Sequence, residues 1–132
     1  RHTRYLSAAS PEADLTLIAN IVYMVNVQNT QTLIVTLPNS PQTGDIVRLL
    51  DVGGNLKYDT TLVVRTPETS GTPIQGDSTG TLFGDRLTPY PSGELVVQTP
   101  NAAFALIYLG AVDSNDQIGI PTSVQGWWLM EV

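Results

Sequence analysis

Few side chains in this sequence are suited to catalysis, and they are scattered along the chain. Its 132 residues include one histidine and no cysteine, which excludes disulfides and thiolate metal sites. The histidine, His2, lies beside the first residue, where such side chains are usually solvated. No serine occupies a Gly-x-Ser-x-Gly motif, and there is no second histidine to act as its base. The sequence therefore predicts no nucleophile–base pair.

Two pairs of carboxylates have the residue types of a glycosidase site, Asp45 with Asp51 and Asp113 with Asp116. On a regular strand, Asp45 and Asp51 would point to one side about 20 Å apart. That separation is too large for two carboxylates that share one glycosidic bond. We expect each of them to be solvated at one end of a strand.

Metal and phosphate motifs are also incomplete. The run from Asp113 to Asp116 is acidic, but it lacks the glycine and the distant glutamate of a calcium-binding helix–loop–helix. Gly53-Gly54 is followed neither by a helical pattern nor by the lysine of a phosphate-binding loop. We therefore expect no catalytic residue, no metal and no cofactor, and a protein that is not an enzyme.

Aromatic residues remain as candidates for binding, namely Tyr58, Tyr90, Trp127 and Trp128. Adjacent tryptophans in a strand point to opposite faces, so one should enter the core while the other faces solvent or a partner. A large apolar ring left outside usually marks a protein interface. We favour an interface here, with a glycan contact through Tyr90 or Trp127 as the alternative.

The composition predicts an all-β fold. Apolar residues make up 42% of the chain and charged residues 14%, which is too apolar for a disordered protein. The apolar set is rich in β-branched residues, and threonine is abundant alongside it, as suits a pleated surface. A chain of this length is expected to form one domain.

Short apolar runs separated by turn residues mark the expected strands. They lie near Leu15 and Leu17, at 21–27, 31–37, 45–51, 60–66 and 81–83, and at 94–99, 102–109 and 127–132. Seven or more such strands predict a single small β-sandwich or flattened barrel over residues 15–132. Residues 1–14 show no sustained period and are expected to form an N-terminal arm or linker.

Turn residues set the expected corners between these strands. Gly53-Gly54-Asn55 is the strongest turn signal and predicts a hairpin or a tight corner. Ile74 to Gly76 is a short apolar contact, and Gly80 to Gly93, which is rich in proline and glycine, reads as irregular surface. Pro38 should end the strand before it, because proline cannot donate to a ladder.

The run from Ala102 to Leu109 is apolar on both faces. Ala102, Phe104, Leu106 and Tyr108 would share one face, and the four intervening residues the other. Such a strand is typically covered on both sides, by a second sheet or by another subunit. The residues predicted to form an interface are Phe104, Leu106, Tyr108, Trp127 and Trp128.

The charge of the chain narrows the range of partners. Twelve acidic residues against six Lys and Arg give a formal charge of −6, and there is no basic cluster. Nucleic acid is therefore an unsuitable partner, and so is an anionic membrane surface. No apolar run is long enough to span a bilayer.

The order of several short motifs resembles the recurrent β-module of tail-fibre and baseplate proteins of tailed phages. Each motif is common alone, whereas their order and spacing over residues 23–132 are specific. In sequence order the motifs are Thr36-Leu37-Pro38, Gly44 to Leu49 with Asp51, the glycine-rich corner, Thr61 to Val64, Ile74 to Asp77, Ala105 to Gly110, and Gly126 to Leu129. The long segment from Gly80 to Gly93 departs from the compact pattern.

The resemblance implies a structural protein of the virion. Modules of this kind, which occur in long-tail-fibre connectors and baseplate wedge pins, are trimeric and non-enzymatic. The expected partners are therefore other copies of this chain and other virion proteins. A capsid decoration protein would need the same kind of sandwich, and a glycan-binding adhesin domain is the alternative from another class.

Overall fold

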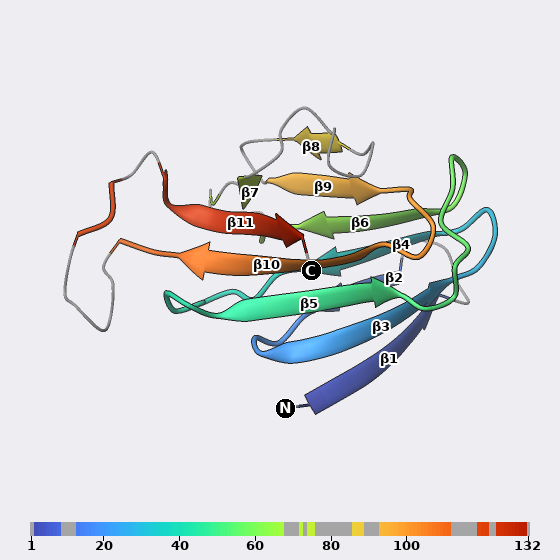
Figure 1. Cartoon of the computed structure of the whole chain (residues 1–132), viewed down its shortest axis with the longest axis horizontal. Coiled ribbons are helices and arrows are strands. Elements are labelled where there is room, and N and C mark those ends of the chain that lie inside the picture. The colour runs from blue at the N-terminus through green and yellow to red at the C-terminus, as the bar shows by residue number, and fades with distance from the viewer. Residues whose placement is uncertain are drawn as a thin grey trace.

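The computed structural model of the chain is a sandwich of two β-sheets (Figure 1). It describes residues 2–8, 13–67, 72, 74–75, 86–88, 93–111, 119–121 and 124–131. Within those ranges the chain forms eleven strands and no α-helix. The all-β prediction is confirmed, and the two sheets form a sandwich rather than a closed barrel.

Six strands form the first sheet and five form the second. In spatial order, sheet A contains β1 (His2–Ala8), β3 (Ile21–Val27), β5 (Ile46–Asp51), β10 (Ala103–Leu109), β11 (Gly126–Glu131) and β7 (Ile74–Gln75). Sheet B contains β2 (Ala13–Thr16), β4 (Thr32–Thr36), β6 (Thr61–Arg65), β9 (Glu94–Val97) and β8 (Arg86–Thr88).

In the first half of the chain, successive strands belong in turn to sheet A and to sheet B. Strands β1 to β6 alternate between sheet A and sheet B, so that β1, β3 and β5 are parallel neighbours in one sheet and β2, β4 and β6 in the other. Parallel neighbours need a crossover connection, and here each crossover is a strand of the opposite sheet instead of a helix. Strands β9 and β10 then pair antiparallel with their neighbours, and β11 pairs antiparallel with β10 but parallel with β7.

Strict alternation of side chains fills the core between the sheets. In β3 the buried positions are Ile21, Tyr23, Val25 and Val27, with half-buried residues between them. The same period places Leu33, Val35 and Leu37 inside, as the sequence pattern predicts. Side chains of successive strand residues point to opposite faces, so one register fixes the whole buried set.

The N-terminal prediction is wrong for residues 2–8 and 13–14. Residues 2–8 form β1, which pairs in parallel register with all seven residues of β3 and lies at the edge of sheet A (Figure 1). Ala13 and Asp14 belong to β2, which pairs with β4. An edge strand has one paired side and needs little apolar periodicity, so the sequence pattern did not reveal it.

Three other predicted segments can be compared with the structure, two of them within the described residues. The glycine-rich turn is a corner that carries the chain from β5 in sheet A to β6 in sheet B, and not a hairpin. Ile74 is buried in β7, in agreement with the predicted short contact. The strand predicted at 81–83 lies outside the described residues, and β8 at Arg86–Thr88 falls in the segment predicted to be irregular.

A buried carboxylate, that of Asp51, closes one end of the sandwich. Its side chain, which is 4% exposed, accepts hydrogen bonds from the backbone N–H of Gly54 (3.2 Å) and of Asn101 (2.9 Å). Gly54 has φ 67° and Asn101 φ 58°, a region that glycine and asparagine tolerate best. Asp51 thereby joins the corner after β5 to the turn before β10.

Asn26 and Asn55 complete the same corner. The Asn55 side-chain amide donates to Asn26 Oδ1 and to the Val27 carbonyl, both at 3.2 Å. A Cβ atom at Gly53 would lie 2.1 Å from Asn26 Oδ1. Gly53 is therefore required because the asparagine side chain approaches its backbone closely.

We expect Asp51→Asn to lower the free energy of unfolding by about 1–3 kcal/mol, because the amide nitrogen cannot accept a backbone hydrogen bond and leaves a buried donor unpaired. Urea unfolding measures the loss. Asp45→Asn is the matched control, since Asp45 is half-buried and accepts only from the Gln42 N–H. Equal losses in the two variants would contradict this role of Asp51.

Candidate functional site

The two sheets differ most in the faces that they turn away from the core. The outer face of sheet A is almost entirely apolar. Its members alternate with the buried residues of β3, β5, β10 and β11. They are Val22, Met24, Ile46, Arg48, Leu50, Ala103, Ala105, Ile107, Leu109, Trp128 and Met130, with the polar Asn26 at the end of β3. Both methionines of the chain belong to this set.

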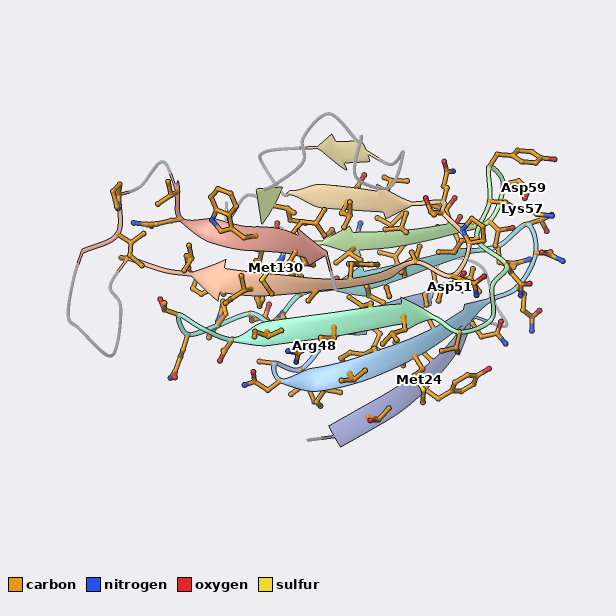
Figure 2. All side chains as sticks on the ribbon, viewed as in Figure 1. Met24, Arg48, Asp51, Lys57, Asp59 and Met130 are labelled. Carbon is orange, nitrogen blue, oxygen red and sulfur yellow. The ribbon has the colours of Figure 1, made fainter. Side chains whose placement is uncertain are left out.

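Strand register makes these residues a continuous surface. One row across the sheet joins Met24, Leu50 and Ala103, and another joins Ile46, Ile107 and Trp128. Directly opposite side chains on neighbouring strands lie about 4.5–5.5 Å apart at Cβ. The outer face of sheet A is therefore one patch by its register, and Figure 2 labels three of its members, Met24 on β3, Arg48 on β5 and Met130 on β11.

Trp128 contributes its ring to this patch, and its indole N–H already has a hydrogen-bond acceptor within the chain. The indole N–H donates to the Val124 carbonyl at 2.7 Å. Tryptophan at an interface otherwise needs a partner for this donor. A covering surface can therefore pack on the ring without having to supply an acceptor.

Among the residues that the structure describes, Arg48 is the one charged member of the outer face of sheet A. In the register it lies between Val22 on β3 and Ala105 on β10, with Met130 beyond Ala105. Across the described residues the single ion pair joins Lys57 to Asp59 at 3.9 Å, so the guanidinium of Arg48 has no carboxylate partner there.

The outer face of sheet B is more polar. Its residues are Thr32, Ile34, Thr36, Thr61, Val63, Arg65, Glu94, Val96 and Gln98. Arg65 lies opposite Glu94 in the register, and the Gln98 amide donates to Thr61 Oγ1 at 3.1 Å. Three threonines and an opposed pair of charges make this face suited to water, in contrast to that of sheet A.

Four of the five predicted interface residues, all except Trp128, lie on the inner face instead. Phe104 and Trp127 are 1% exposed and Leu106 is fully buried, because β10 and β11 turn these side chains toward sheet B. Tyr108 packs on Trp127 with ring centroids 5.3 Å apart. These residues hold the core together, and buried Trp127 has no surface to offer to a glycan.

Trp128 lies outside, as expected for one of two adjacent tryptophans, and it is half-buried. The sequence pattern missed its neighbours on the outer face of sheet A, chiefly Ile107, Leu109 and Met130. They share its side because Trp128 pairs with Ile107 across β10 and β11. The sequence showed that β10 is apolar on both faces, but it did not show which of the two faces packs into the core.

The remaining candidates give no site for chemistry. Asp45 and Asp51 flank β5 at opposite ends, and each accepts backbone hydrogen bonds. Tyr58 is 84% exposed. Tyr90 and the acidic run 113–116 lie outside the described residues. In the described part of the chain no three His, Asp or Glu side chains gather as metal ligands, and no helix there is long and apolar enough to span a bilayer.

Comparison with known proteins assigns no family to the chain. No protein-family model matches the sequence, and no curated protein matches it. The size and composition of the outer face of sheet A are therefore the main guides to function.

The patch has the area of a small interface. Four long strands, β3, β5, β10 and β11, carry its members. At about 4.8 Å between strands and about 3.3 Å per residue, they cover about 19 Å by about 20 Å. The resulting area is about 380 Å² in projection, or about 760 Å² over two partners, which is the size of a small, weak contact.

Replacing the two tryptophans separately tests their placement. We expect Trp127→Ala to lower the free energy of unfolding by about 3–5 kcal/mol, as for a large aromatic lost from a core. Trp128→Ala should cost about 1 kcal/mol, chiefly for its bond to the Val124 carbonyl. Urea unfolding at low protein concentration measures both, and a larger loss for Trp128→Ala would contradict the assignment of inner and outer faces.

Proposed function

We propose that this chain is a structural module of a tailed-phage virion, in a tail fibre, baseplate or spike, and that it acts by assembling as a homotrimer without catalysis. The ordered motifs between residues 23 and 132 support the phage assignment through their resemblance to tail modules. The outer face of sheet A supports the assembly role. This face is the observation that carries the proposal.

An apolar sheet face is unfavourable for a protein that works alone in water. Burying apolar area contributes about 25 cal/mol per Å², and a core has already formed between the two sheets without using this face. Large exposed apolar patches mark interaction sites. A second subunit on the outer face of sheet A would cover Ile46, Ile107 and Trp128 together.

Acidic charge on the rest of the molecule fits an assembling protein. The chain carries a formal charge of −6, whereas the described residues on the outer face of sheet A include a single charge, the cation of Arg48. Net charge keeps separate chains soluble and slows nonspecific association. Association would therefore be directed to the face that carries almost no charge.

Sedimentation equilibrium tests the proposal. We expect the chain to reach three times its mass of 14.2 kDa, and Ile107→Glu to weaken assembly by at least about 100-fold, because a carboxylate would be buried against apolar residues. Ile34→Glu is the matched control, since Ile34 is equally half-buried on the outer face of sheet B and should leave assembly unchanged.

Circular dichroism and urea unfolding establish that both variants remain folded. A chain that stays monomeric up to millimolar concentration would contradict the proposal. Assembly lost in Ile34→Glu but kept in Ile107→Glu would assign the contact to sheet B instead.

A further inference from the structure

The position of Arg48 restricts how a second copy can cover the outer face of sheet A. Arg48 is the third residue of β5, which is the third of six strands in the sheet. Apolar residues flank it in the register, with Val22 on one side and Ala105 and Met130 on the other. Arg48 therefore starts from the middle of the patch and not from its rim.

Covering this face removes water from the Arg48 guanidinium. Within the described residues no ion pair neutralises that charge. A buried guanidinium is costly unless a carboxylate or several acceptors meet it, and its planar fork suits a carboxylate best. The covering surface must therefore bring an anion to the centre of the patch.

A two-fold contact between identical faces fails this requirement. Such a contact places the same patch on both subunits, so two Arg48 side chains would meet near the axis. None of the other described members of the patch is charged. Like charges placed together at a desolvated interface oppose association.

A different surface of the same chain meets the requirement. Twelve acidic residues stand against six Lys and Arg, and none of the acidic residues that the structure describes belongs to the outer face of sheet A. A contact between unlike surfaces of identical chains is heterologous, and it closes into a ring when the rotation permits. A trimer is one such ring.

We propose that the outer face of sheet A binds a second copy of this chain through a different, acidic surface of that copy, and that a carboxylate of the copy pairs with Arg48. The inference rests on the proposed assembly function and specifies its contact. Arg48 would set the orientation of the subunits, while the surrounding apolar residues supply most of the buried area.

Variants at Arg48 test the contact by sedimentation equilibrium on the whole chain. We expect Arg48→Met to weaken assembly by about 30-fold or more, because the carboxylate of the copy is left buried without a partner. Arg48→Glu should weaken it by about 100-fold or more, and Arg48→Lys by less than Arg48→Met. Lys57→Met removes the same charge at an exposed corner and should leave assembly unchanged.

Mixing wild type with Arg48→Glu separates the two kinds of contact. In a two-fold contact the mixture would form Arg–Glu pairs and assemble more tightly than either protein alone, and Arg48→Met would also strengthen assembly. Either result would overturn the heterologous contact while leaving the assembly function in place. If no Arg48 variant changed the association constant, the heterologous contact would also be overturned.

A wild-type chain that never assembles would refute both the contact and the proposed function.

Discussion

The buried carboxylate of Asp51 joins two passages of the chain between the sheets. After β5 the chain leaves sheet A through Gly54, and before β10 it returns through Asn101; both backbone N–H groups donate to Asp51. Asp51 N–H in turn donates to the Ala102 carbonyl at 2.8 Å. The register of β5 against β10 begins at this point, and that register sets Ile46 beside Ile107 and Arg48 beside Ala105 on the outer face.

Apolar residues in this chain serve two separate surfaces. The inner faces of both sheets close on each other, with Tyr23, Phe104 and Trp127 among the largest fully buried side chains. The outer face of sheet B is polar, whereas that of sheet A repeats the chemistry of a core around one arginine. Folding thus uses one apolar face of β10 and leaves the other available, which is the physical basis for proposing assembly.

Alternation along single strands was sufficient to predict the all-β class and the inward direction of Leu33, Val35 and Leu37. Alternation could not assign strands to sheets. The parallel pairing of β1 with β3 and of β4 with β6 depends on contacts between residues some 19 to 29 positions apart. Strand β1 escaped prediction because an edge strand needs no apolar period. In β10 both faces are apolar, so only the pairing with β5 and β11 reveals that Phe104 points inward and Ile107 outward.

The central claim is that the outer face of sheet A becomes covered when chains associate. Hydroxyl-radical footprinting read by mass spectrometry measures this directly, because Met24, Met130 and Trp128 are readily oxidised and all lie on that face. Tyr58, in the connection between β5 and β6, is 84% exposed and is not a member of the face. On raising the protein concentration, we expect Met24, Met130 and Trp128 to become protected and Tyr58 to be oxidised as before. Protection of Tyr58 with unchanged oxidation of Met24, Met130 and Trp128 would contradict it.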